Sequence, residues 1–297
     1  MKTICLIMVF FIALINGSIC FAMDWKDLHE SADQLTVLEA VARSESSPGS
    51  IEDLYTLALV YLNDYDHWKA KDIFSAILGQ DPSRFEARWG IAECLRREHK
   101  KEESVAILGP IIEQYPDFSP AYITFAYIRY IQGQFTESIA LTGKVINQGK
   151  RNVDAANFLR AHGLYAAARG MLAHYGGPWS KAVNGASVWK HLDIIQKLAP
   201  DSAVVNFGVG SYYLLIPIAF GRDLKKAEQY LLRAAEKDPR FADIYVRLGQ
   251  IYQIQGDEAK YQIYLQKALS LDPGNELALD IQNGICKFIC FSSEVKK

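Results

Sequence analysis

The sequence lacks both a strong imbalance of charge and the motifs of the common enzyme classes. Its 297 residues include 32 Lys and Arg and 34 Asp and Glu, so the net charge is only −2. This argues against a nucleic-acid-binding chain, which usually carries a basic face. No P-loop, Gly-x-Ser-x-Gly or His-Glu-x-x-His motif occurs, and the six histidines show no metal-ligand spacing. We therefore predict a protein that is not an enzyme, with no catalytic residue, no metal and no cofactor.

Long apolar runs are also scarce. The longest, Ile4 to Ile15, has twelve residues, fewer than the roughly 20 that a membrane span requires. Lys2 precedes this run, and Cys20-Phe21-Ala22 follows it with small residues at signal-peptidase spacing. We expect residues 1–22 to be an export signal cleaved after Ala22, and the protein to be periplasmic or secreted.

Cys20 leaves one alternative open. Gly17-Ser18-Ile19-Cys20 distantly resembles a bacterial lipobox, although Ile19 is bulkier than the small residue that such motifs place before the cysteine. The chain would be attached to a membrane only if Cys20 were lipidated.

Few cysteines remain beyond the signal: Cys94, Cys286 and Cys290. An odd number cannot fully pair within one chain. If Cys286 and Cys290 lay on one helix, their Cβ atoms would be about 6 Å apart, whereas a disulfide needs about 3.8 Å. We therefore expect three buried thiols, although an exported protein can also form a structural disulfide.

Prolines, by contrast, recur at regular intervals. Pro48, Pro82, Pro116, Pro200, Pro239 and Pro273 are separated by 34, 34, 84, 39 and 34 residues. The clearest unit is Ala242–Pro273, in which two runs with apolar residues at helical spacing flank Gln255-Gly256-Asp257. Two short amphipathic helices joined by a tight turn form an antiparallel hairpin.

This unit resembles the tetratricopeptide repeat (TPR). Numbered from Ala242, the matching residues are Tyr245 at position 4, Leu248-Gly249 at 7–8, Tyr252 at 11, Leu265 at 24, Ala268 at 27 and Pro273 at 32. The resemblance implies an all-α, right-handed superhelix of stacked hairpins.

The proline register then divides the chain. Residues 23–50 are expected to form an N-terminal cap and connector, with a single helix from Asp24 to Arg43. Residues 51–274 should form six hairpins with insertions near 171–189 and 214–222, and residues 275–297 a capping helix and a tail that folds back. Small residues at repeat positions 8 and 20 should let paired helices approach closely. Because Tyr261 stands at position 20 of the last repeat, we expect that hairpin to be splayed.

The family resemblance implies that the first helix of each hairpin lines a concave groove. Carried onto this chain, the lining is aromatic and aliphatic with one basic spot, and suits an apolar peptide or amphipathic helix. Its residues are Tyr55, Leu59, Trp89, Glu93, Arg96, Arg97, Ile123, Tyr127, Tyr130, Ile131, Phe207 and Ser211. The alternative is that these side chains fill the inner curve as core.

The two insertions suggest a second surface. Both should emerge on the same edge of the superhelix, where aromatic residues could wall an apolar ligand pocket or merely seal irregular hairpins. The candidates are Trp179, Tyr212, Tyr213, Pro217, Phe220 and Arg222.

Residues 179–240 also weakly resemble exported bacterial TPR proteins, including the T-component associated with TRAP-type import systems. The resemblance rests on Gly210-Ser-Tyr-Tyr213, Pro217 and Phe220-Gly-Arg-Asp223. The leading hypothesis is a non-catalytic scaffold that docks a protein or peptide partner in the concave groove. The alternative is an accessory of such an import system that binds a small apolar molecule through the insertions.

Overall fold

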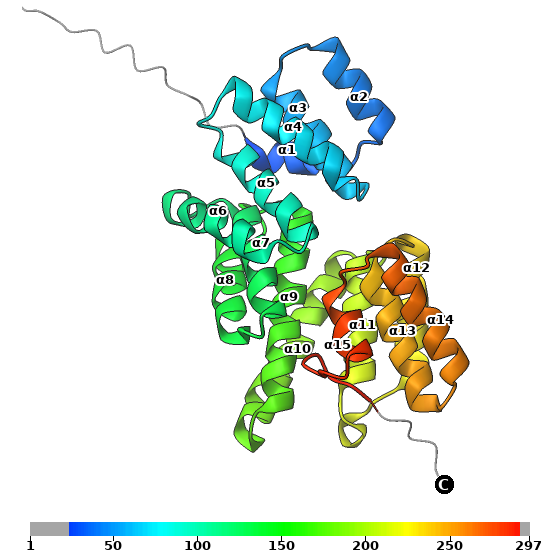
Figure 1. Cartoon of the computed structure of the whole chain (residues 1–297). Coiled ribbons are helices and arrows are strands. Elements are labelled where there is room, and N and C mark those ends of the chain that lie inside the picture. The colour runs from blue at the N-terminus through cyan, green and yellow to red at the C-terminus, as the bar shows by residue number, and fades with distance from the viewer. Residues whose placement is uncertain (1–23, 292–297) are drawn as a thin grey trace, which may run out of the picture.

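A computed structural model describes residues 24–291, and within that range it contains fifteen α-helices, one short 3-10 helix and no strand. The expected signal peptide and Cys20 lie outside the described residues. Figure 1 shows the helices stacked side by side into a curved superhelix, so the all-α fold predicted from the repeat pattern is confirmed. No helix between residues 24 and 291 combines the length and apolar character that crossing a bilayer requires.

Twelve of the helices pair in sequence order into six antiparallel hairpins. They are α3 (Ile51–Asn63) with α4 (His67–Gln80), α5 (Phe85–Arg97) with α6 (Lys101–Gln114), α7 (Ser119–Ile131) with α8 (Phe135–Gln148), α9 (Ala155–Tyr175) with α10 (Pro178–Leu198), α11 (Ala203–Leu215) with α12 (Leu224–Lys237), and α13 (Ala242–Gln255) with α14 (Glu258–Leu271). The first helix of each pair carries most of the buried residues and lies toward the inside of the curve.

Small side chains permit the close approach of the paired helices. Ala58, Ala92 and Ala126 are fully buried at the crossing points. A Cβ added at Gly210 would lie 2.8 Å from the Leu231 side chain, closer than real Cβ contacts allow. Ser104 fits its crossing because its hydroxyl donates to the Ala92 carbonyl oxygen at 2.7 Å.

The last hairpin is not splayed, so the expectation based on Tyr261 was wrong. A Cβ at Gly249 would lie 3.4 Å from the Tyr261 backbone oxygen and 3.5 Å from its ring. The Tyr261 ring is buried and lies beside Gly249, which has no side chain to exclude it. A large residue on one helix is therefore accommodated by a glycine on the other.

The N-terminal region forms two helices, not the single helix expected from Asp24 to Arg43. α1 (Trp25–Ala32) ends at Asp33, and α2 (Val37–Ser46) begins after Thr36. A capping box starts α2, because the Thr36 hydroxyl accepts from the Glu39 amide and the Thr36 amide donates to Glu39 at 2.8 Å. The break lets α1 turn back into the concave side of the first hairpins, where the His29 ring lies 3.0 Å from the Tyr55 hydroxyl.

The two insertions lengthen one hairpin and one loop. α9 and α10 have 21 residues each, and the 3-10 helix η1 (Ile218–Phe220) lies between α11 and α12. Figure 1 shows the tip of the α9–α10 hairpin and the η1 loop projecting from the same edge of the molecule.

The C-terminal segment folds back as expected, but its cysteines are paired, which corrects the expectation of buried thiols. After α15 (Glu276–Gln282) the chain leaves the helical conformation, with φ of 61° at Cys286 and 71° at Ile289. This non-helical path brings the Cys286 and Cys290 Cα atoms to 5.1 Å and allows the disulfide. Cys94 is a buried free thiol, as expected.

We predict that Ala126→Trp disrupts the middle of the array. Ala126 has no exposed surface where α7 crosses α8, and overpacking a well-packed core costs about 1–3 kcal/mol for a few added methylenes, so a whole indole should cost at least that. Thermal unfolding followed by circular dichroism would measure the loss. Ala106→Trp, at an exposed position of α6, is the matched control; an equal melting temperature for both variants would contradict this helix pairing.

Candidate functional site: the concave groove

A continuous groove runs along the inside of the superhelix, with a cavity volume of about 1810 Å³. It is lined mainly by the first helices of the hairpins, because their inner faces point toward the axis of the curve. α10, the η1 loop, α1 and the C-terminal segment complete its wall. The volume exceeds the roughly 300–1,000 Å³ of ordinary small-molecule pockets, so the space suits a segment of polypeptide or several groups together.

Most of the predicted groove residues line this space. They are Leu59, Trp89, Glu93, Arg96, Arg97, Ile123, Tyr127, Tyr130, Ile131, Phe207 and Ser211. Three residues of the second predicted surface, Tyr212, Pro217 and Phe220, line the same groove. The two predicted surfaces are therefore one continuous cavity in the described part of the chain.

Five of the predicted groove residues are buried in the hydrophobic core: Tyr55, Leu59, Trp89, Ile123 and Ile131. Tyr55 has no exposed surface and does not line the groove. Trp89 is 5 % exposed, and its indole Nε1 donates to the Thr124 hydroxyl at 3.1 Å. Both rings pack against His29 of α1, which covers this end of the concave face.

Three residues of the predicted ligand pocket lie elsewhere. Trp179 is 81 % exposed at the start of α10. The Tyr213 ring is stacked on that of Tyr230, and the Arg222 guanidinium lies 5.2 Å from the centre of the Phe291 ring. None of the three lines the groove, so a separate pocket walled by the six predicted residues does not form.

The basic spot predicted on α5 is partly neutralised by Glu93. Arg96 and Arg97 both donate to the Glu93 carboxylate, at 2.6 and 2.9 Å. Burial alone would raise the pKa of Glu93, but the two guanidinium groups outweigh it and hold that pKa well below its usual range. The single carboxylate offsets only one of the two positive charges, so the spot keeps a net positive charge that can attract an acidic group.

A buried polar cluster lies deeper in the groove, on α13. Arg247 is 4 % exposed and donates to Gln250 at 2.7 Å, but its Nε–H has no partner among the described residues. Burial lowers the pKa of Arg247 and raises that of neighbouring Asp243. An unpaired donor on a buried cation is costly, and because the Nε atom is itself buried, the side chain must shift before an acceptor from an incoming group can pair with it.

Polar contacts between distant repeats close the groove at two places. At the first, which we call the histidine clasp, His99 Nε2 lies 2.9 Å from Asp272 and Nδ1 lies 3.0 Å from Glu276. Lys101 lies 3.3 Å from the same Glu276 carboxylate. Gly274 allows this approach, because a Cβ there would lie 2.3 Å from the His99 ring.

The second contact joins the α3–α4 turn to the α12–α13 turn. The Tyr65 hydroxyl donates to Asp238 at 2.5 Å, and Arg240 donates to the Asp64 backbone and carboxylate at 2.6 and 2.9 Å. The guanidinium of Arg240 also lies 4.9 Å from the centre of the Tyr65 ring. The early and late hairpins are thus linked across the groove mouth.

These contacts could not be predicted from the sequence. The paired residues are 173 to 177 positions apart, and nothing in a local pattern relates them. Among the described residues, no three His, Cys, Asp or Glu side chains are placed to hold a metal ion.

The comparisons with known proteins agree with this architecture. Residues 242–275 match the family model described as "Tetratricopeptide repeat". A tetratricopeptide repeat protein from Parabacteroides merdae has a similar structure, with a TM-score of 0.53, 13 % identity, and coverage of 86 % of this chain and 96 % of the other. A chain of the APC/C hetero-tetramer Cut9-Hcn1 gives a TM-score of 0.56 at 14 % identity, over 85 % of this chain and 46 % of the other. No curated protein sequence matched the chain.

We predict that the histidine clasp weakens as pH rises. Hydrogen bonds to Asp272 and then Glu276 raise the pKa of His99 from 6.5 to about 9. A raised folded-state pKa means that the clasp contributes fully below pH 6.5 and is lost as pH rises through about 9. Small-angle X-ray scattering should show the molecule opening over that interval, and His99→Ala should remove the dependence. An identical pH profile for the His99→Ala variant would contradict a role for the clasp.

We also predict that Trp89→Ala destabilises the fold, whereas an exposed groove residue would have little effect. Truncating a buried Trp costs about 3–5 kcal/mol, and here it also removes the Nε1–H that donates to the Thr124 hydroxyl, although Thr124 still donates to Glu93 at 3.0 Å. Denaturant unfolding would measure the loss. Trp179→Ala, whose ring is 81 % exposed, should change stability by less than about 0.5 kcal/mol.

Proposed function

We propose that this protein is a non-catalytic scaffold that holds a segment of a partner protein in its concave groove. The chain contains a tetratricopeptide repeat and folds as a TPR-type solenoid. The observation that carries this proposal is the groove itself, a continuous cavity of about 1810 Å³ along the inner faces of successive hairpins. TPR folds generally serve protein–protein interaction. The finer assignment to this groove is our inference.

The chemistry of the lining favours a partner segment with an apolar body. Tyr127, Phe207 and Tyr212 present aromatic surface, which buries a large area at low entropy cost. The unpaired Nε–H of Arg247 is itself buried, so it would bind a carbonyl or carboxylate oxygen of that segment only after a shift of its side chain. An amphipathic or largely apolar peptide fits both features.

We further propose that the protein acts in the cell envelope or outside the cell. The supporting observations are the predicted signal at residues 1–22 and the Cys286–Cys290 disulfide, since disulfides persist mainly in oxidising compartments. Neither the family match nor the two similar structures supports the transport-accessory alternative, and the predicted separate ligand pocket does not form.

The test is to fill the groove without disturbing the core. Ala167 is an exposed, groove-lining residue of α9, so Ala167→Trp should obstruct the groove while leaving the melting temperature unchanged. Crosslinking and pulldown from envelope extract, followed by mass spectrometry, would identify partners of the parent chain. We expect Ala167→Trp to weaken binding of those partners by about tenfold or more, equivalent to 1.4 kcal/mol or more.

Ala76→Trp is the matched control, because Ala76 is an exposed residue of α4 outside the groove. It should bind the same partners with unchanged affinity. Equal binding by both variants would place the partner site elsewhere on the molecule.

A further inference from the structure

The edge formed by the α9–α10 tip and the η1 loop exposes several large apolar side chains. Of the twelve large apolar side chains that are exposed in the described residues, six lie on three segments at this edge. We call these six residues the aromatic edge. They are Tyr175 (55 % exposed), Trp179 (81 %), Val183 (47 %), Ile218 (67 %), Phe220 (73 %) and Ile285 (67 %).

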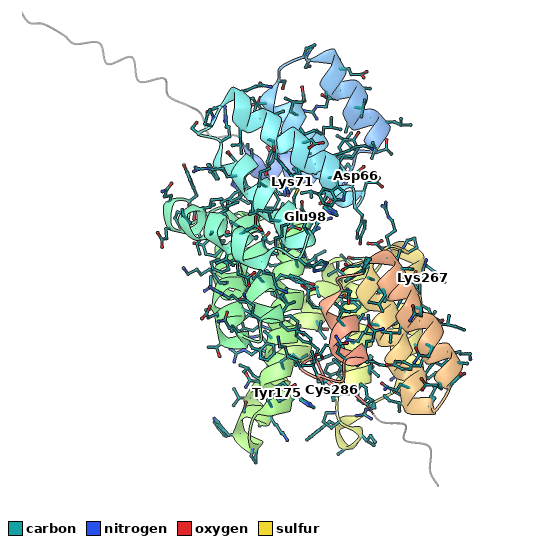
Figure 2. The ribbon with its side chains drawn as sticks, viewed as in Figure 1. Asp66, Lys71, Glu98, Tyr175, Lys267 and Cys286 are labelled. Carbon is teal, nitrogen blue, oxygen red and sulfur yellow. A yellow bond between two sulfur atoms is a disulfide. The ribbon has the colours of Figure 1, made fainter. Side chains whose placement is uncertain are left out.

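The three segments lie next to one another. The Tyr175 hydroxyl at the α9–α10 tip donates to the backbone oxygen of Lys287 at 2.6 Å, and Figure 2 shows Tyr175 beside Cys286. Arg222, just after the η1 loop, lies over the Phe291 ring at 5.2 Å. The C-terminal segment therefore contacts both projecting elements, and the aromatic edge is one surface built from three parts of the chain (Figure 1).

Acidic residues are missing from these segments. No Asp or Glu occurs between Asp154 and Asp193, a stretch that contains Arg160, Arg169, Lys181 and Lys190. None occurs between Asp201 and Asp223, the stretch that contains the η1 loop, or between Asp280 and Glu294. In a chain that has slightly more acidic than basic residues overall, this local exclusion of negative charge is a specific property of the edge.

We propose that the aromatic edge docks onto the surface of an anionic lipid bilayer. Exposed Trp, Tyr and Phe beside Ile and Val are the side chains that partition into the interfacial layer of a membrane. Lys181 is exposed two residues after Trp179, where it can approach lipid phosphates while the indole inserts. The three segments contribute no carboxylate of their own, although Asp223 directly follows Arg222, and burial together with the Asp280 charge raises the pKa of Tyr175, so repulsion from anionic headgroups is weak.

The shape of the edge favours a bilayer over a folded protein partner. Trp179 and Phe220 sit on separate convex projections, the α9–α10 tip and the η1 loop, which can each enter a soft interface to its own depth. This contact does not depend on a lipid at Cys20. Phe220 and Lys181 also line the groove, so the aromatic edge borders the groove.

The direct test is flotation with vesicles of phosphatidylcholine alone and of phosphatidylcholine mixed with phosphatidylglycerol. The full exported chain should float with the anionic vesicles, and raised salt should weaken that binding. Trp179→Ser combined with Phe220→Ser should weaken it by about tenfold or more. Both side chains are more than 70 % exposed, so folding should be unaffected.

Matched controls distinguish vesicle binding through the aromatic edge from nonspecific adsorption through other exposed apolar side chains. Leu38→Ser combined with Ile263→Ser removes two apolar side chains that are 82 % and 65 % exposed on α2 and α14, and should leave vesicle binding unchanged. Lys181→Glu should weaken binding by about tenfold, because each interfacial cation contributes about one kcal/mol and reversal adds repulsion. Lys267→Glu on α14, labelled far from the edge in Figure 2, should have no such effect.

Several results would overturn the proposal. Failure of the parent chain to float with anionic vesicles would do so, as would equal affinity for the neutral and the anionic vesicles. Loss of binding in the Leu38/Ile263 control to the same extent as in the Trp179/Phe220 variant would show that the edge is not special. If a Trp179→Ser variant, which leaves the groove lining unchanged, still floated but lost a protein partner, the edge would be a protein-docking surface.

Discussion

The whole structure depends on one constraint: a helix hairpin buries one face internally and leaves another that only a neighbouring hairpin can cover. The internal face can be buried because small residues, such as Ala58, Ala126 and Gly210, lie where the paired helices cross. The open face of each hairpin is covered when the hairpins stack in sequence order. This stacking produces the curve, and the curve gives the first helices of the hairpins a shared concave face. The groove is thus a consequence of packing, and its chemistry is set by the residues on the inner side of each first helix.

At each end of the array, an additional helix covers the apolar face that the outermost hairpin would otherwise expose. At the N-terminus α1 turns into the concave side, where His29 contacts Tyr55 and Trp89. At the C-terminus α15 covers the last hairpin, and Phe288 and Ile289 are buried behind it. The Asp280 carboxylate fixes this return by accepting from the Lys287 and Phe288 amides at 2.9 and 2.7 Å. Both caps narrow the groove while they protect the core.

The sequence predicts the repeats well, because each hairpin is held by contacts within a stretch of about 30 to 44 residues. Helix periodicity, small crossing residues and terminal prolines are all local signals within such a stretch. It predicts the groove less well. Trp89 has the spacing of a groove residue, and only the unexpected turn of α1 buries it. The capping box at Thr36 and Glu39 was a readable signal for that turn. The disulfide was missed because Cys286 and Cys290 were assumed to be helical. The contacts of His99 with Asp272 and Glu276 have no local signature, because they form only when the curvature of the array brings distant hairpins together.

The contacts between early and late hairpins also affect how the array should unfold. An open array of repeats frays from its ends, because each unit is held only by its neighbours. Here Asp64 and Tyr65 of the first hairpin contact Asp238 and Arg240 near the last, and His99 contacts Asp272. A terminal hairpin therefore cannot peel away without also breaking a bond to a unit far along the chain. The array behaves as a ring joined by polar links, in which melting is expected to be more concerted than in a linear stack, and in which a single bound segment would hold both halves together.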